Sequence, residues 1–348
     1  MKISRLLYMV AVAAVVSATT SCRDELCYDH YPALDLSLSW EHEWERDYGM
    51  NHAANWDAEL HGFAYNDLRP EKPEWVTSLR YTADGNAVQK HMTVDGGKII
   101  LEDDNEASSL LLYNGDTEYI VLSDMASLPD ARASATLRSR SSLSYMMDRH
   151  PGARSTNSPD VLYAAYVETV PRVEMHSTHQ LPLKMQPLVY TYVVHYEFDY
   201  GAQHIAEARG ALGGMAESVY LRDGSTSGQS VIVLYDCEVP TYGCRAILRS
   251  FGTPGFPDEY YGKSSAAASD RPYTLNLEIL LKNGQTKEFN FDVADQLANQ
   301  PRGGVIRVGG MHIEDNEALY ESGFDVDVSG WGDSEIVDLP LELEGDED

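Results

Sequence analysis

The cysteine at position 22 has the clearest chemical role in the sequence. Lys2 and Arg5 precede an unbroken apolar run over residues 6–16, and small or hydroxyl residues lead from there to Cys22. This is the layout of a secretory signal, and its apolar core is too short for a permanent membrane span. Because lipoprotein processing needs a cysteine directly after small residues, we expect a lipid on Cys22. The alternative is an ordinary secretory signal with an incidental cysteine, which Thr19 keeps open.

The three other cysteines could form a disulfide or bind a metal. Cys237 and Cys244 have six residues between them, including a proline and a glycine. In an oxidising envelope, this spacing is compatible with a disulfide that closes the turn and equally with two buried thiols. Cys27 is left over as a packed or free thiol. His176 and His179 form an HxxH pair without a nearby cysteine, so we expect no metal site and no cofactor.

Several patterns resemble catalytic or binding motifs but fail on spacing. GALGGM at 210–215 lacks the glycine spacing of a dinucleotide turn and the Lys-Ser/Thr end of a nucleotide loop. HEWER at 42–46 has an arginine where a zinc protease needs its second histidine. The acidic run 325–333 lacks the bidentate carboxylate of a calcium loop. There is no GxSxG elbow, and nothing selects two carboxylates for glycoside hydrolysis. We therefore expect a protein that is not an enzyme.

The charge of the chain limits its partners. Without residues 1–21 it carries 24 basic and 55 acidic side chains, a net charge of −31. Such a surface repels nucleic acid, so we expect no DNA or RNA partner. No other segment is apolar and long enough for a transmembrane helix, and two or three acyl chains hold a protein stably on a membrane. The lipid on Cys22 is therefore the membrane contact that we expect.

Alternation of apolar and polar residues predicts strands along most of the chain. Residues 34–40 and 190–198 each place alternate apolar side chains on one face. Two hairpins are predicted: one across the turn Asn114–Asp116, and one across Asn283-Gly284 that joins 275–281 to 287–293. One segment, 205–219, has apolar residues at steps of three and four and predicts a short helix weakened by three glycines.

These elements predict an all-β fold of two tandem β-sandwich domains with one short helix. The 327 residues from Cys22 onward exceed one comfortable core, and prolines at 171, 182 and 187 place the boundary near 175. The expected organisation is a signal peptide at 1–21, a lipidated segment at 22–27, an N-terminal β-sandwich at 28–175, and a C-terminal β-sandwich with an acidic tail at 176–348.

Two further segments are candidates for contact with partners. Residues 41–74 are acidic, aromatic and irregular, and are either a recognition loop or a tolerated surface insertion; we favour the insertion. The segment from Ile336 alternates like an edge strand, and Pro340 removes one ladder donor, which suits an edge. Either a partner strand adds here or the proline blocks such pairing; we favour addition. The residues of this possible strand-addition edge are Ile336, Val337, Leu339, Leu341 and Leu343.

Several stretches together resemble a known family. The signal leads into CRDELCYDHYP, and LLLYNGDTEYIVL, PDVLYAAYVE, GALGGMAES, FNFDVADQL and SGFDVDVSGW follow. The series resembles the fimbrillin-like lipoproteins of Bacteroidota, in a subgroup described as a domain of unknown function, and is similar in plan to fimbrial anchor and accessory subunits. The resemblance implies two transthyretin-like β-sandwiches, a surface-exposed outer-membrane lipoprotein, no catalytic residues, and assembly by strand addition.

Two functions remain open. The first is a structural or interaction protein, such as a fimbrial anchor, accessory subunit or adhesin, with envelope or fimbrial subunits as partners. The alternative is a glycan-binding surface lipoprotein of a polysaccharide-uptake system, since tryptophan and tyrosine rings suit sugar faces and the chain has 5 Trp and 22 Tyr. Most tyrosines fall at core or cross-strand positions, which favours the first function.

Overall fold

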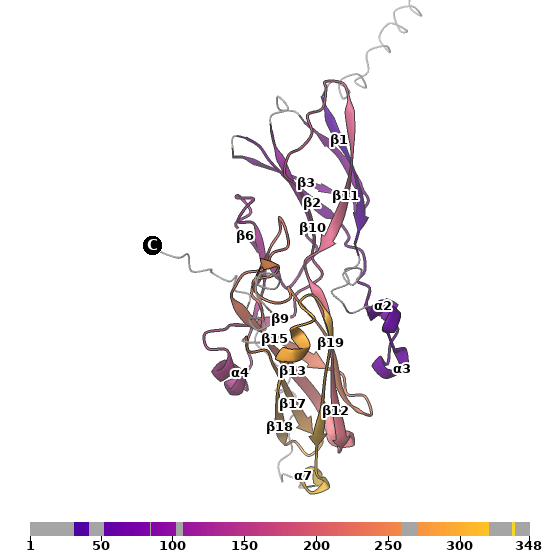
Figure 1. The fold of residues 1–348 in the computed structure, drawn as a ribbon, viewed down its shortest axis with the longest axis vertical. Coiled ribbons are helices and arrows are strands. Elements are labelled where there is room, and N and C mark those ends of the chain that lie inside the picture. Colours follow the sequence, from indigo (N-terminus) through magenta and orange to yellow (C-terminus); the bar gives the residue numbers. More distant parts are fainter. Residues whose placement is uncertain are drawn as a thin grey trace, which may run out of the picture.

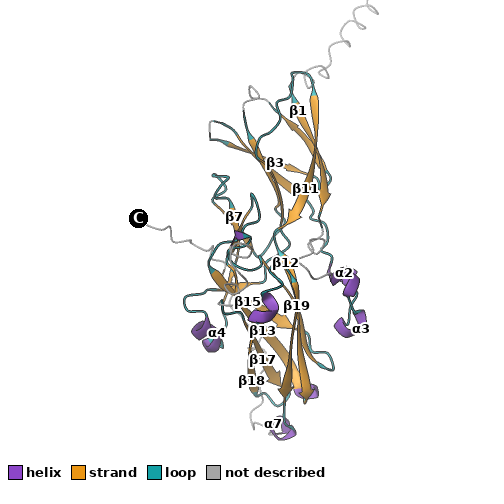
Figure 2. Ribbon diagram, in the orientation of Figure 1, coloured by secondary structure: helices purple, strands orange, loops and turns teal. Residues whose placement is uncertain are grey.

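The computed structural model describes residues 31–41, 52–83, 85–101, 107–258, 271–319 and 336–337. Strands dominate these residues and the helices are short (Figure 2). Two groups of strands follow one another along the longest axis of an elongated molecule (Figure 1). The predicted all-β class is confirmed. The helices are α2 (His52–Asn55), α3 (Ala58–His61), η3 (Tyr65–Leu68), α4 (Ser144–Arg149), η4 (Ala202–His204), α6 (Ala294–Leu297) and α7 (Asp315–Leu319).

The first group is a seven-stranded sheet in the order β3-β2-β5-β10-β11-β1-β4. The predicted alternation of the first strand is confirmed, because Leu34 and Leu36 are buried in a cluster with Leu112 and Met185. The strands are β1 (Ala33–Trp40), β2 (Val76–Tyr81), β3 (Ala87–Met92), β4 (Gly96–Ile100), β5 (Ser109–Asn114), β10 (Tyr163–Val167) and β11 (Thr178–Pro187).

The second group is built around two facing sheets, here called the short sheet and the long sheet. The short sheet has the order β16-β12-β19 and the long sheet β18-β17-β13-β15-β9-β8-β20. Their strands are β8 (Leu137–Arg138), β9 (Ser155–Asn157), β12 (Tyr190–Tyr200), β13 (Ile205–Ala216), β15 (Ser230–Cys237), β16 (Gly243–Ser250), β17 (Thr274–Leu281), β18 (Thr286–Asp292), β19 (Gly304–His312) and β20 (Ile336–Val337).

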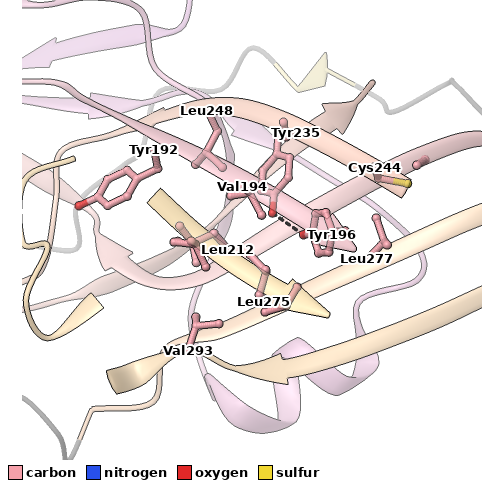
Figure 3. Packing of buried hydrophobic residues seen from close by; sticks show 14 of the residues in the cluster. Tyr192, Val194, Tyr196, Leu212, Tyr235, Cys244, Leu248, Leu275, Leu277 and Val293 are labelled. Carbon is pink, nitrogen blue, oxygen red and sulfur yellow. Dashed lines mark hydrogen bonds between the residues drawn. The ribbon is translucent and has the colours of Figure 1, made fainter. Parts of the chain in front are cut away.

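The core between these two sheets contains the predicted strand faces. Tyr192, Tyr196 and Leu277 are fully buried there (Figure 3). The hydroxyl groups of Tyr196 and Tyr235 lie 2.7 Å apart, and Tyr196 donates to the carbonyl of Asn276. The hairpin of β17 and β18 forms as predicted, with Leu277 paired to Phe289.

A fourth, small sheet covers the first one. It has the order β14-β7-β6, and its residues Ala133 and Val219 pack on Leu111 and Tyr113 of the first sheet. Its strands are β6 (Ile120–Ser123), β7 (Arg132–Ala135) and β14 (Ser218–Tyr220).

The predicted helix at 205–219 is wrong, because β13 and β14 occupy these residues. Ala208 and Leu212 lie on the core face of β13. Gly210 lies between them, two residues from each, so this part of the segment follows the period of a strand. Met215 returns to this face only because the register shifts at Gly214, whose φ is +93°. A second shift follows Ile205. Two β-bulges therefore produced the steps of three that resemble a helical period.

The predicted hairpin across Asn114–Asp116 is also wrong. β5 pairs with β2 and β10, whereas β6 pairs with β7 in the small sheet. Gly115 does not adopt a positive φ, and the Asn114 side chain instead accepts from the N–H of Tyr163 and donates to the carbonyl of Val161. The turn residues thus bind the start of β10 and lead the chain into a different sheet.

The first sheet extends past the predicted boundary at 175. β11 pairs in parallel with β1, and its last residues Gln186 and Pro187 pair with β10. At Pro182, β11 has a partner strand on the β1 side only, so the missing N–H is tolerated. After Pro187 the chain leaves the first sheet for the last time among the described residues, and β12 of the short sheet follows at Tyr190.

Candidate functional site

The described residues offer no site for a metal ion and no membrane-spanning helix. No group of three or more His, Cys, Asp or Glu within these ranges could hold a metal. No helix there has the length and apolarity to cross a bilayer. The candidate functional features are therefore the sheet edges, where unpaired backbone groups can bind another strand.

The outer edge of β19 is closed by two glutamine side chains. The Gln296 amide donates to the carbonyl of Arg307 and accepts from its N–H, both at 2.9 Å. The Gln300 amide does the same at Val305, at 2.9 and 2.6 Å. The two amides therefore occupy the backbone groups that a neighbouring strand would use.

The outer edge of β16, on the other side of the short sheet, is occupied at two positions. Glu238 and Arg245 exchange both backbone hydrogen bonds, at 2.7 and 2.9 Å. The Ser158 hydroxyl accepts from the N–H of Arg249 and donates to its carbonyl. Between these two positions, the backbone N–H and C=O groups of Ile247 are the ones on this edge that a strand could still bind. Both edges of the short sheet are thus poor acceptors for a strand.

The edge of the long sheet at β18 has a different character. Leu281 bonds to Gln285 at one end of the β17–β18 ladder, and Val293 bonds to Tyr273 at the other. Because these bonds alternate along an antiparallel pair, the N–H and C=O groups of residues 286, 288, 290 and 292 point away from β17. Among the described residues, no strand pairs with this side of β18.

The core-facing side chains of β18 are incompletely covered. Phe289 and Phe291 pack against the core of the second group but stay half-exposed, whereas their neighbours on β17, Leu277 and Leu275, are fully buried. Lys287 lies over the Phe289 ring, 5.5 Å from its centroid. A strand added to β18 would cover the two phenylalanine rings, so this edge offers apolar area as well as hydrogen bonds.

The opposite end of the long sheet is the segment predicted as a strand-addition edge. Ile336 and Val337 form β20, the last strand in the sheet order, and pair with Arg138 and Leu137 of β8. The other three predicted edge residues, Leu339, Leu341 and Leu343, lie outside the described residues, as do Cys22 and Cys27.

Residues 52–68 form short helices that pack on the second group, so the expectation of an irregular loop is wrong for them. In Figure 1, α2 and α3 lie beside the lower group of strands. Leu68 packs with Val193 on the outer face of the short sheet, together with Trp56 and Phe63. This segment, here called the strap, connects β1 to β2 and covers a sheet of the other group. The remaining residues 42–51 of the predicted insertion lie outside the described ranges.

Two histidines join the strap to the short sheet. His61 Nδ1 and His195 Nε2 lie 2.9 Å apart, and the Trp56 indole stacks on the His61 ring with centroids 3.9 Å apart. Arg245 donates to the His61 carbonyl at 2.7 Å. Burial first, and the neighbouring His61 second, lower the pKa of His195 to about 4.

Acidification is expected to weaken the protein through this contact. Since the pKa of His195 is about 6.5 in the unfolded chain and about 4 when folded, its contribution is complete above pH 6.5 and is lost as the pH falls to 4. The maximum loss is about 3 kcal/mol. Urea unfolding at pH 7 and 4.5 should show a smaller pH effect in His195→Gln than in the native protein; equal pH effects would contradict this role.

Cys237 and Cys244 lie on the two facing sheets, at the end of β15 and the start of β16. Both are free thiols in the structure, Cys244 buried and Cys237 half-buried. Burial raises the pKa of Cys244 to about 12. The pKa of Cys237 lies well above its ordinary value, because of burial first and the neighbouring Cys244 second. The disulfide stays a prediction for the oxidised protein.

Alkylation tests this disulfide. If Cys237 and Cys244 are bridged, purified mature protein unfolded without reductant labels only at Cys27. Reduction should then lower the free energy of unfolding by no more than about 3 kcal/mol, because the closed loop is short. Labelling of both Cys237 and Cys244 without reductant would show two thiols and contradict the bridge.

The two glutamines that close the outer edge of β19 were not predicted from the sequence. A local signal existed, since Gln296 and Gln300 are four residues apart around a short helix just before a strand, and this spacing places two side chains on one face. The bond between Ser158 and the edge of β16 had no such local signal, because Ser158 is far from Arg249 in the chain.

Solved structures of other proteins have a similar arrangement of sheets. A candidate adhesin from Bacteroides ovatus is similar with a TM-score of 0.54 at 17% identity, over 84% of this chain and 96% of that one. The fimbrial anchor protein Mfa2 from Porphyromonas gingivalis gives a TM-score of 0.45 at 11% identity, over 83% of this chain and 94% of that one. At 17% identity, the likeness to the Bacteroides ovatus protein shows the fold alone. No curated protein matches the chain.

Residues 62–236, half of the chain, match the family described as a domain of unknown function (DUF5119). The chain belongs to this family. The predicted membership of a family described as a domain of unknown function is thereby confirmed.

Proposed function

We propose that this protein is an accessory or anchor-type subunit of a surface fimbria or adhesin, which binds another envelope protein by accepting an extended strand at β18. The observation that carries the proposal is the contrast between edges. Other groups of the chain occupy both edges of the short sheet, whereas the side of β18 (Thr286–Asp292) that faces away from β17 has no strand beside it among the described residues. The adhesin-like fold and the absence of a catalytic motif agree with a binding role.

The residues of β18 define the partner strand. Backbone hydrogen bonds would provide affinity, and alternate side chains would provide register. The partner needs apolar side chains at every second position to cover Phe289 and Phe291. Its other face should be neutral or basic, because Glu288 and Asp292 lie on the exposed face of β18 and the whole chain is strongly acidic.

A proline substitution tests this edge with little effect on the fold. The N–H of Glu288 points away from β17, so Glu288→Pro removes a donor from the open edge only. Glu288→Ala is the matched control, since it removes the same side chain and keeps the N–H. In pull-downs from intact cells, we expect the proline variant to lose the partner and the alanine variant to keep it. Equal recovery with both variants would remove β18 from the mechanism.

The C-terminal segment is proposed as a second contact. Deletion of 336–348 should leave a folded protein, because the described part of this segment, β20, pairs with two residues of β8. Loss of the partner in this deletion, with normal recovery in Glu288→Pro, would assign strand addition to the end of the sheet at β20. Unchanged recovery in both variants would contradict strand addition.

We also propose that a lipid on Cys22 holds the protein in the outer membrane with its two β-sandwich units facing outward. Cys22→Ala is expected to abolish lipidation and release the protein from washed membranes, because no other anchor is expected. Fractionation followed by immunoblotting measures this. A variant that stays in the membrane fraction would show that something other than lipid holds the chain.

A further inference from the structure

An exposed tryptophan lies at the edge of the first sheet, far along the chain from β18. The Trp75 side chain directly precedes β2 and is 43% exposed. Its indole stacks on the imidazole of His91 in β3, with centroids 5.2 Å apart and an interplanar angle of 17°. Trp75 and His91 thus form a flat aromatic surface on the outside of the molecule.

This platform, Trp75 with His91, is fixed by hydrogen bonds to the histidine ring. Nδ1 of His91 lies 3.1 Å from the hydroxyl of Thr77, which is buried, and Nε2 lies 3.3 Å from the amide nitrogen of Gln89. With both ring nitrogens held, the indole has a rigid support. A rigid surface loses little conformational entropy when a ligand binds.

Polar groups surround the platform. Gly115 lies beside the indole: a Cβ there would be 3.7 Å from Trp75 Nε1. The adjacent Asp116 carboxylate is exposed and is held in place by the N–H of Glu74 at 2.8 Å and the side-chain amide of Asn114 at 2.9 Å. Among the described residues, no acceptor takes a hydrogen bond from the indole N–H of Trp75.

We propose that this platform binds a neutral carbohydrate. A pyranose ring has an apolar face of C–H groups that can lie on the indole, and hydroxyl groups at its rim that can donate to carboxylates and accept from an indole N–H or an amide. The acidic rim and the strongly negative chain disfavour sulfated or uronic acid glycans. This site is independent of the proposed strand-accepting edge, because it lies on β2 and β3 of the first sheet.

The molecule provides a matched control for the test. Tyr200 also stacks on a histidine, His312, with centroids 5.1 Å apart and an angle of 23°, and is 42% exposed. Its hydroxyl is already bound to Asp315, and it lies on the second group of strands. Tyr200→Ala therefore removes a comparable exposed aromatic ring without touching the Trp75 platform.

Affinity electrophoresis with a soluble glucan, a galactan, a mannan and a sulfated galactan tests the proposal on the mature protein. We expect at least one neutral polysaccharide to retard the native protein, with about tenfold or greater loss of affinity in Trp75→Ala. Trp75→Phe should keep most of the binding and Tyr200→Ala all of it. Circular dichroism of each variant shows whether it is folded.

The proposal is overturned by any of three results: no neutral polysaccharide retards the native protein, Trp75→Ala binds as well as native, or the sulfated galactan binds most tightly. Loss of binding in Tyr200→Ala equal to that in Trp75→Ala would also overturn it. None of these outcomes bears on partner recovery by Glu288→Pro, so failure of one proposal leaves the other intact.

Discussion

Glu278→Gln is expected to lower the free energy of unfolding by about 3 kcal/mol or more. The Glu278 carboxylate is 5% exposed on the outer face of the long sheet, where Arg209 binds it at 2.9 and 3.1 Å and Ser142 donates to it. Arg140, also buried, lies 3.7 Å away. Burial alone would raise the pKa of Glu278, but these bonds outweigh it and lower the pKa. Removing the charge leaves two arginines without their buried partner.

Urea unfolding at pH 7 measures this effect, with Glu238→Gln as the matched control. Glu238 pairs with Arg245 but is exposed, with 67% of its side chain accessible. Its loss should therefore cost less than about 1 kcal/mol. Since the pKa of Glu278 is lowered, the stability that it contributes is present at neutral pH and is lost in acid. Equal destabilisation by the two variants would contradict a special role for the buried cluster.

Gly210→Ala is expected to destabilise the protein by about 2–3 kcal/mol through overpacking. Gly210 pairs with Tyr235 across β13 and β15, and a Cβ at position 210 would lie 2.2 Å from the tyrosine ring. The ring cannot easily move, because its hydroxyl is bonded to Tyr196 in the core (Figure 3). The glycine therefore makes room for a buried aromatic ring.

Gly228→Ala is the control, because a Cβ there would meet no atom within 4 Å and its φ is not positive. Thermal unfolding of both variants measures the change in melting temperature that each substitution causes. A change in melting temperature for Gly210→Ala that is no larger than for Gly228→Ala would show that the Tyr235 ring has room to shift.

The strand faces that alternate without interruption could be predicted from the sequence. Leu34 and Leu36, and the hairpin that turns at Asn283-Gly284, were correctly placed, because period two is a local signal that the sheet imposes directly. The same reasoning failed at 205–219, where bulges shifted the side chains of β13 and created a helical spacing. A bulge depends on pairing with distant strands, which a local pattern does not contain.

The contacts between distant segments could not be predicted. β8 and β9 belong to the first half of the chain but complete the long sheet beside β15, and the strap covers the short sheet from between β1 and β2. A boundary at 175 assumes that each half supplies its own sheets. The open edge of β18 could not be predicted for the same reason. Whether an edge is open depends on side chains such as Ser158, which reach an edge from elsewhere in the chain.

In the function that we propose, β18, and not an edge of the short sheet, receives the strand of another envelope protein. Photo-crosslinking in intact cells tests it most directly, with a photoreactive amino acid at Glu288 on β18 and, separately, at Ile247 on β16. Both side chains are exposed. We expect an adduct with an envelope protein from position 288, through an extended segment with alternating apolar residues, and none from position 247. An adduct from position 247 alone, or from neither position, would contradict it.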